Sequence, residues 1–286
     1  MSLQGGADPR YSNPELPEGI NASEEHPLRE FAWLGTGAVA LVLVIVFALG
    51  WAGQWMGALI PFSFETRLAA SVASPLREAA DSPAREALQK LADRLVKADP
   101  LPEGMRITLH LADSAERNAF ATLGGHVFVT RGLLDALPSE NALAMVLAHE
   151  IGHVRQRHVI RSIGRGLLVS LALGVLTGTG QDDPASGALS QAGLTSALGF
   201  SRDQEREADQ LGLHALQALY GHVAGAASLF ELLEKEHGLR APEWFNSHPD
   251  NAARIAAIEM HARTAGWPLQ GAQSPMPSAL AAAAAQ

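Results

Sequence analysis

The sequence predicts a mainly α-helical protein with a small antiparallel β-sheet and an N-terminal transmembrane helix. Three observations predict this fold class. A charge-free apolar run covers residues 31–64, later segments repeat apolar residues at helical spacing, and residues 105–130 alternate like strands around a Gly-Gly pair. The 286 residues are enough for one sizeable domain with appendages.

The N-terminal region is interpreted as a tail followed by a membrane anchor. Residues 1–30 contain scattered prolines and acids without apolar periodicity, so we expect a flexible tail. Residues 31–60 are long enough to cross a lipid bilayer, and Trp33, Trp51 and Trp55 occupy positions typical of interfacial aromatic residues. We therefore expect a single-pass membrane protein. Basic residues are nearly balanced on the two sides of the span, so the sidedness stays open.

Residues 61–102 predict a helical linker that packs on the following domain. Ser82 and Pro83 form a helix-start signal, and apolar residues between Leu88 and Val96 share one helical face. The domain itself is expected at residues 103–264. It begins with strand-like segments, of which two flank the hairpin signal Gly124-Gly125. A free strand edge can pair with an extended peptide.

The motif His149-Glu150-Ile151-Gly152-His153 is the strongest chemical signal in the chain. Residues four apart lie on one face of a helix, so both imidazoles can hold one zinc ion and leave coordination positions open. Glu150 reaches the edge of the same site, where it can take a proton from water. Ser139 and the apolar residues after it predict that a helix carries the motif. The alternative is a pair of buried structural histidines.

A third metal ligand is predicted farther along the chain. Glu205 and Asp209 are also four residues apart and share a helix face. The carboxylate of Glu205 can complete a three-ligand set, and Asp209 can accept the N–H of a liganding histidine. Glu207 points elsewhere on that helix. Considered alone, this charged run is equally typical of a solvated helix face.

Together these motifs resemble the zinc metallopeptidase family that includes the CaaX prenyl endopeptidases and the HtpX-type stress proteases. The resemblance covers about residues 103–262, with four motifs in the family's order. The segment Asn118-Ala119-Phe120-Ala121 resembles the family's strand before the metal helix, and we assign substrate binding to its residues. Ser247-His248-Pro249 with Arg254 resembles the C-terminal His-Pro motif.

The resemblance implies a zincin-like domain, one zinc ion per chain and a bacterial inner-membrane location, with a periplasmic domain as one of two orientations. His248 is a candidate for stabilising the oxyanion or capping the zinc; the alternative is a helix-start residue before Pro249. Arg254 is expected to tie its helix to the active-site carboxylates. His158 is expected to have a structural role, because it lies at a different angle around the helix from the predicted ligands.

Residues 166–181 form an uncharged aliphatic run after the metal motif. A second membrane span is one interpretation. Since His153 precedes the run and Glu205 follows it, a single crossing would separate two ligands of one ion, and we favour an element over the active site or at the membrane surface. The Gly- and Asp-containing residues 178–184 suggest a mobile lid. Residues 265–286 are rich in Gln, Ser, Pro and Ala and predict a disordered tail.

The sequence thus predicts a membrane-anchored zinc metalloendopeptidase. The resemblance implies polypeptide substrates, namely misfolded or damaged membrane and envelope proteins. The formal net charge of -9 argues against nucleic acid as a partner, and with no cysteine in the chain any metal must be held by His, Asp and Glu. The alternative is a non-catalytic membrane-tethered chaperone or adaptor with a structural zinc, although a structural site has no need of Glu150. The sequence does not indicate an oligomeric state.

Overall fold

The computed structural model describes residues 27–71, 82–177, 199–228, 231 and 251–284. It divides the chain into two compact units, residues 1–45 and 46–286. The helices and strands of the described residues are α1 (Pro27–Leu59), α2 (Phe62–Ser71), α3 (Pro83–Ala98), β1 (Thr108–Ala112), β2 (Ala119–Ala121), the 3₁₀ turn η1 (Leu123–Gly125), β3 (His126–Thr130), α4 (Arg131–Ala136), α5 (Glu140–Arg155), α6 (His158–Thr177), α8 (Arg202–Tyr220), α11 (Asn251–Thr264) and α12 (Ser278–Ala284).

Helix α1 is the candidate membrane span of the described chain. It has 33 residues, more than the roughly 20 that cross a bilayer. Within its segment Leu28–Leu59, a stretch of 18 residues has a mean hydropathy of 2.5, and large apolar side chains such as Phe47 are exposed. The helix begins at Pro27, so the last four residues of the predicted tail are helical. Pro61 follows its end and separates it from α2.

Helix α6 begins shortly after α5, the helix that carries His149 and His153. It contacts the C-terminal part of α1. Glycines make this contact possible: a side chain added at Gly57 would come within 2.8 Å of the Ile160 carbonyl oxygen, and one at Gly53 would overlap Gly164. The predicted aliphatic run is therefore helical as far as Thr177. The predicted lid at residues 178–184 lies outside the described residues.

The sheet is small, as predicted, but it is mixed rather than wholly antiparallel. Its order is β1-β3-β2. Strands β2 and β3 are antiparallel, with Phe120 opposite Phe128, whereas β1 and β3 are parallel, with His110 opposite Phe128. The predicted antiparallel pairing is therefore wrong for β1. Residues 113–118 connect β1 to β2 across the position of one strand, and β3 occupies that position between them. The predicted Gly-Gly turn is confirmed, since Gly124 and Gly125 have φ of 74° and 82°.

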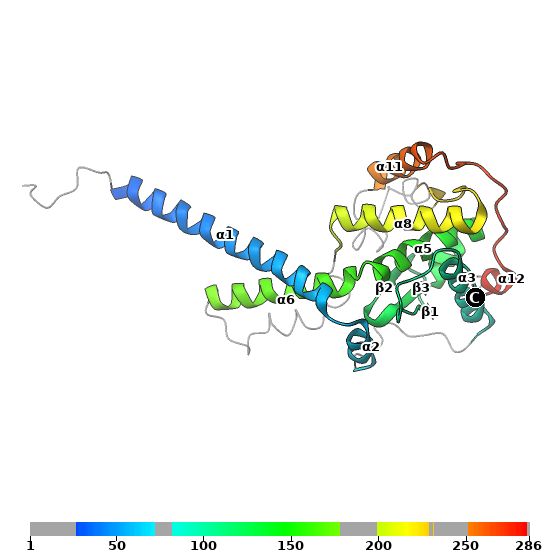
Figure 1. Ribbon diagram of the computed structural model, residues 1–286, viewed down its shortest axis with the longest axis horizontal. Coiled ribbons are helices and arrows are strands. Elements are labelled where there is room, and N and C mark those ends of the chain that lie inside the picture. The colour runs from blue at the N-terminus through cyan, green and yellow to red at the C-terminus, as the bar shows by residue number, and fades with distance from the viewer. Residues whose placement is uncertain (1–26, 72–81, 178–198, 229–230, 232–250, 285–286) are drawn as a thin grey trace, which may run out of the picture. The chain divides into compact units, whose positions relative to one another are not determined.

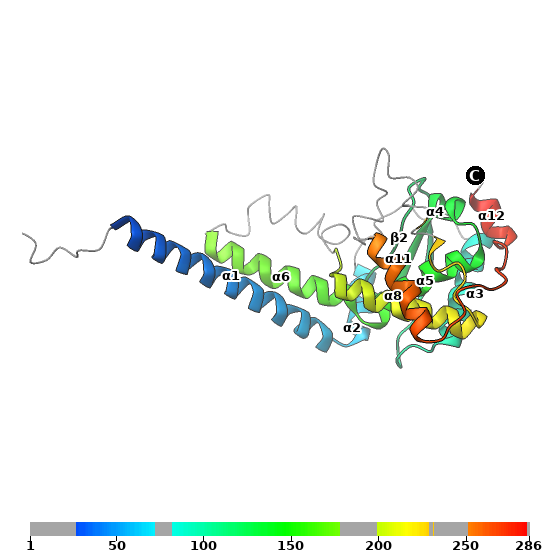
Figure 2. The same cartoon turned by 90° about the horizontal axis from the view of Figure 1, so that it is seen from above.

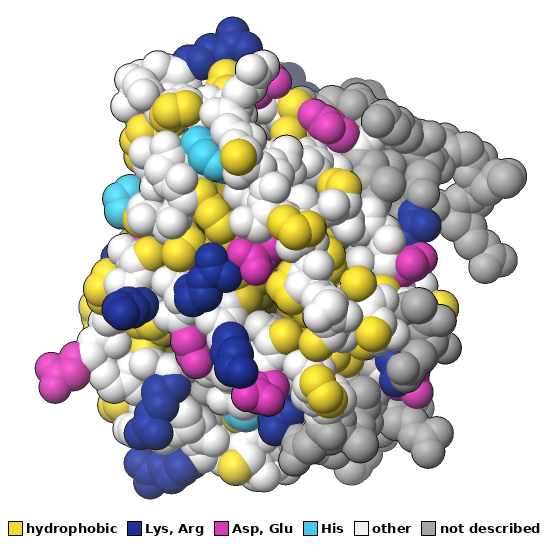
Figure 3. Space-filling view, turned by 90° about the vertical axis from the view of Figure 1, so that its right-hand side faces the viewer, with side chains coloured by type: hydrophobic (Ala, Val, Ile, Leu, Met, Phe, Trp, Pro, Cys, Tyr) yellow, Lys and Arg dark blue, Asp and Glu magenta, His cyan; other side chains and the backbone are white. Residues whose placement is uncertain are grey.

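The core of the second unit surrounds α5. Every residue from Glu140 to Val154 is buried, and α8 packs along this helix while α3 and the sheet cover its other sides (Figure 1). Helix α3 starts at the predicted Ser82 cap. Ion pairs connect it to both ends of α5. Arg94 lies 2.9 Å from Glu140, and Asp99 lies 2.7 Å from Arg155. Figure 3 shows basic and acidic side chains close together on one face of this unit.

The C-terminal segment corrects the predicted disordered tail. Residues 265–284 belong to the second unit, where α12 lies against α3 and α4 with Leu280 fully buried (Figure 2). The segment also satisfies polar groups at the start of α5. The Ser274 N–H donates to Asn141 Oδ1 at 2.7 Å, and its carbonyl accepts from the Glu140 N–H at 3.0 Å. The prediction failed because composition alone does not reveal these partners.

Candidate active site

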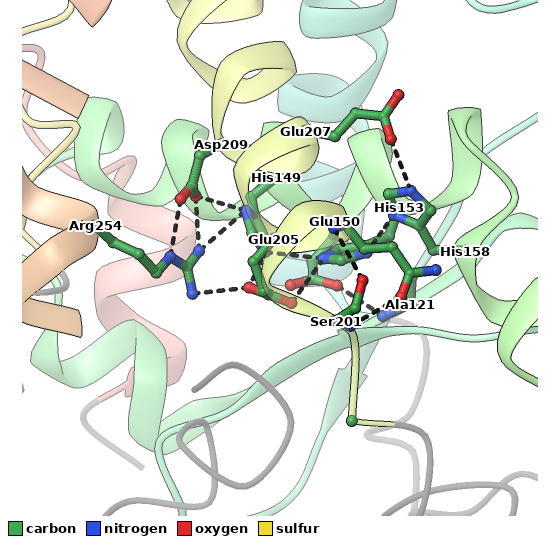
Figure 4. A network of polar contacts seen from close by, with 12 residues as sticks. Ala121, His149, Glu150, His153, His158, Ser201, Glu205, Glu207, Asp209 and Arg254 are labelled. Atoms are coloured by element: carbon green, nitrogen blue, oxygen red, sulfur yellow. Dashed lines mark hydrogen bonds and ion pairs between the residues drawn. The ribbon is translucent and has the colours of Figure 1, made fainter. Parts of the chain in front are cut away.

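Three potential metal ligands from two helices meet in the buried interior. On α5, His149 Nε2 and His153 Nε2 lie 3.0 Å apart. From α8, the Glu205 carboxylate approaches both, with one oxygen 3.5 Å from His149 Nε2 and the other 3.6 Å from His153 Nε2. Figure 4 shows the three side chains converging. The predicted ligands are therefore brought together, although they are separated by more than fifty residues of sequence.

Small residues let α5 and α8 approach closely enough for this meeting. A side chain added at Gly152 would lie 3.2 Å from the Ala208 Cα, and one at Gly212 would lie 3.3 Å from the backbone nitrogen of His149. Helix α8 is fixed at its start by a reciprocal cap between Ser201 and Gln204. The cap sets where the first turn begins, and Glu205 lies in that turn.

Asp209 and Arg254 support His149 from behind. Asp209 Oδ1 lies 3.0 Å from His149 Nδ1 and accepts its N–H, which leaves Nε2 directed at the cluster. Arg254, from α11, donates to both oxygens of Asp209 at 2.7 and 2.8 Å and lies 2.8 Å from Glu205. Burial alone would raise the pKa of Asp209, but its bonds to His149 and Arg254 outweigh burial and lower it. Arg254 thus joins the carboxylates, as predicted from the resemblance.

His158 and Glu207 support His153 in the same manner. Burial lowers the pKa of His158 to about 3, so its ring is neutral and has one N–H. Glu207 Oε2, at 3.3 Å, can only accept and therefore takes the Nε2–H of His158. His158 Nδ1 then accepts from His153 Nδ1, 2.9 Å away, which leaves His153 Nε2 directed at the cluster. The sequence analysis did not predict that Glu207 binds His158. The one sequence feature that pointed to this support was His158 itself, five residues after His153.

Glu150 lies between the metal-type ligands and the edge of the sheet. Its Oε2 accepts the backbone N–H of Ala121 at 2.8 Å. Burial raises the pKa of Glu150 to about 8, and the neighbouring charge of His149 opposes part of this effect. Backbone groups alternate along a strand, so Ala119 and Ala121 direct theirs away from β3. Glu150, the predicted base, is therefore adjacent to the edge strand.

The other predicted site residues differ in their positions. Asn118 precedes β2, and its backbone N–H and carbonyl both bond to Thr130. Phe120 stacks on Phe128 with ring centres 5.2 Å apart, on the sheet face opposite the core. His110 and His126 are sheet residues, as expected, and contact each other at 2.8 Å. The predicted catalytic His248 lies outside the described residues, so its role stays a prediction.

The cluster fits a divalent metal ion of the zinc type. Two imidazole nitrogens and one carboxylate oxygen are a known set for catalytic zinc, and ligands of a tetrahedral zinc lie about 3.4 Å from one another. Here the two Nε2 atoms lie 3.0 Å apart, and each lies 3.5 to 3.6 Å from one of the two oxygens of Glu205. They form the one group of three or more metal-type ligands found among the described residues. Without an ion, two Nε2 atoms and a carboxylate would face one another at short range.

Comparisons with known proteins agree with this site. The model of "Peptidase family M48" matches residues 83–262. The chain is 36% identical over 157 residues to mitochondrial metalloendopeptidase OMA1 of Schizosaccharomyces pombe, which covers 53% of this chain and 45% of the relative. It is 31% identical over 181 residues to the beta-barrel assembly-enhancing protease of Escherichia coli, covering 54% and 36%. The chain therefore spans less than half the length of these relatives.

Proposed function

This chain belongs to peptidase family M48, a family of metal-dependent peptidases, and on that basis we propose that it is a membrane-anchored zinc metalloendopeptidase. The family model matches more than half of the chain and includes all three potential metal ligands. Zinc is proposed as the metal because the ligand set is His, His and Glu with no further protein donor in the cluster of described residues.

The observation that carries the proposal is the contact between Glu150 and the edge strand. The carboxylate sits beside the metal-type ligands and is held by the Ala121 N–H at 2.8 Å. A peptide that pairs with β2 would therefore pass directly in front of the base. A purely structural metal site needs neither a base nor a strand edge beside it. This arrangement favours peptide hydrolysis over the adaptor alternative.

The chain's own residues suit each task of peptide hydrolysis. His149, His153 and Glu205 would hold the ion, which would lower the pKa of water and polarise the peptide carbonyl. Asp209 and His158 keep the two imidazoles oriented with Nε2 toward the cluster. Glu150 would accept a proton from the attacking water and deliver it to the leaving nitrogen. Arg254 offsets the negative charge of Glu205 and Asp209.

The proposed substrates are misfolded or damaged membrane and envelope proteins. Pairing with a strand edge requires an extended backbone whose N–H and carbonyl groups are unpaired, which unfolded segments offer and folded domains do not. Helix α1 is the proposed anchor that keeps the enzyme at the bilayer. The name of the Escherichia coli relative connects that protein with β-barrel assembly.

Casein cleavage by the purified full chain tests the proposal. Replacing Glu150→Gln keeps the shape of the side chain but removes the base, so we expect cleavage to fall by about 10² to 10⁴-fold. Metal content, measured by mass spectrometry, should stay equal. Glu86→Gln, at an exposed position of α3, is the matched control. Equal cleavage by both variants would refute the role of Glu150. A metal-loaded wild type that cleaves neither casein nor unfolded membrane proteins would favour the adaptor alternative.

A further inference from the structure

A buried ion pair joins the segment after α1 to the end of the metal helix. Glu65 lies on α2 and is only 4% exposed. Arg157, between α5 and α6, donates its Nε–H to Glu65 Oε1 at 2.6 Å. The Arg157 guanidinium also lies over the Phe62 ring, 6.0 Å from its centre. Glu65 is separated from Arg157 by 92 residues and lies outside the part matched by the family model.

The second oxygen of Glu65 contacts the turn that follows the edge strand. The backbone N–H of Gly124 donates to Glu65 Oε2 at 3.4 Å. The two backbones are close here, since a side chain added at Gly124 would lie 3.0 Å from the Thr66 Cα. Gly124 belongs to η1, three residues after Ala121, whose N–H holds Glu150. Glu65 is therefore connected through η1 to the strand proposed to bind substrate.

Arg157 also lies at the junction that follows α5, two residues after its end at Arg155. Its φ is 60°, the one positive value of a non-glycine residue in the described part of the chain. This conformation is unfavourable for arginine and needs support from its surroundings. It interrupts the helix between α5 and α6, and α6 starts at His158, whose Nδ1 lies 2.9 Å from His153 Nδ1. By holding Arg157, Glu65 supports the histidine that orients a predicted metal ligand.

We propose that Glu65 is a positioning residue for the candidate active site, holding the substrate strand β2 and the α5–α6 junction in place at the same time. Its role as a positioning residue rests on the proposed function; the two contacts do not. One carboxylate fixes two walls of the site, because each oxygen has a different partner. Removing its charge loosens both walls without touching any predicted ligand. Docking of α2 therefore links the segment next to the candidate membrane span with the geometry of the site.

Amide hydrogen exchange on the full chain in detergent micelles tests this inference without requiring activity. In Glu65→Gln we expect exchange about tenfold faster in residues 119–125 and 154–160, equivalent to about 1.4 kcal/mol. Helices α3 and α8 should keep their wild-type rates, as should the whole chain in the control Glu86→Gln. In Arg157→Gln, only residues 154–160 should exchange faster, because Glu65 keeps its bond to Gly124.

Two results would overturn the inference. The first is an unchanged exchange rate in both segments of Glu65→Gln. The second is an equal increase in α3 and α8, which would mean that Glu65 stabilises the whole fold and positions nothing in particular. If Glu65→Gln does not fold, Glu65→Asp keeps the charge on a shorter side chain and should give a smaller increase in the same two segments. If wild-type protein cleaves no substrate, the proposed function fails while the exchange result still decides this inference.

Discussion

At the scale of single residues, each histidine of the candidate metal site has its own supporting chain of polar groups. His149 donates to Asp209, which Arg254 holds with two hydrogen bonds. His153 donates to His158, which donates to Glu207. Both chains fix the tautomer that directs Nε2 toward the cluster. The two supports differ in charge, since Asp209 is anionic and His158 is neutral.

Removing the charge of Asp209 should weaken metal binding. Partners that orient a ligand histidine typically contribute 10- to 100-fold in metal affinity, so we expect about that loss in Asp209→Asn. Competition with a chelator measures the affinity. Asp203→Asn, at an exposed position of the same helix, is the control and should bind as the wild type does. An unchanged affinity in Asp209→Asn would mean that Asp209 does not orient His149.

Metal affinity should also depend on pH through His149. Burial lowers the pKa of this histidine, but the hydrogen bonds to Asp209 and Glu205 outweigh burial and raise it to about 9 in the metal-free protein. Below that pH the ring carries a proton that the ion must displace, so affinity should fall about tenfold for each pH unit below 9. Chelator competition between about pH 7 and 9 measures this slope. A flat profile would contradict the predicted ligand role of His149.

At the scale of secondary-structure elements, the site depends on how closely α5 and α8 pack. Gly152 faces Ala208, and Gly212 faces the backbone of His149. Larger residues at these contacts would separate the helices. The carboxylate of Glu205 would then move away from the imidazoles of His149 and His153. The packing of two helices is therefore a requirement for the proposed chemistry.

A bulky residue at this contact should destabilise the protein. In Gly152→Val the new side chain would meet the Ala208 backbone, and overpacking of this kind costs about 1–3 kcal/mol. Denaturant unfolding of the metal-free protein measures the loss. The control is Gly166→Ala on α6, where an added Cβ meets nothing within 4 Å; it should leave stability unchanged or raise it by about 0.5–1 kcal/mol. Equal stabilities of Gly152→Val and wild type would show that the helices tolerate separation.

These contacts explain which parts of the site the sequence could predict. His149, Glu150 and His153 lie within five residues on one helix, so the 3.6-residue period alone relates them. Matching Glu205 to them required knowledge of zinc-ligand chemistry and the four-residue spacing of Glu205 and Asp209, and the family resemblance supported it. The pairs of His158 with Glu207 and of Arg157 with Glu65 were not predictable, because each depends on the helix break at Arg157 and on helices distant in sequence. The mixed strand order likewise depends on a connection with no sequence signal.

At the scale of the whole molecule, segments on both sides of the family-matched region contribute to its structure. Residues 83–262 match the family model, yet α2 contacts η1 from one side of the sequence and α12 contacts α3 and α4 from the other. The helical linker was predicted to pack on the domain, whereas the C-terminal segment was predicted to be disordered. Its low sequence complexity concealed Leu280, which is fully buried.

Shortening Leu280 tests the importance of the C-terminal segment. A buried Leu→Ala change costs about 2–5 kcal/mol, so we expect a clear fall in the unfolding free energy of Leu280→Ala. Met260→Ala removes a large side chain that is 66% exposed and should change stability by less than about 0.5 kcal/mol. Equal unfolding curves for wild type and Leu280→Ala would restore the disordered-tail interpretation.

The hydrogen bonds between Ser274 and the first turn of α5 have a practical consequence for work on relatives of this chain. A gene fragment that encodes only the family-matched residues 83–262 would lack Ser274, which binds the first turn of α5. It would also lack Glu65. An inactive recombinant fragment of that kind would report on where it was cut, and would say little about whether the intact molecule is an enzyme.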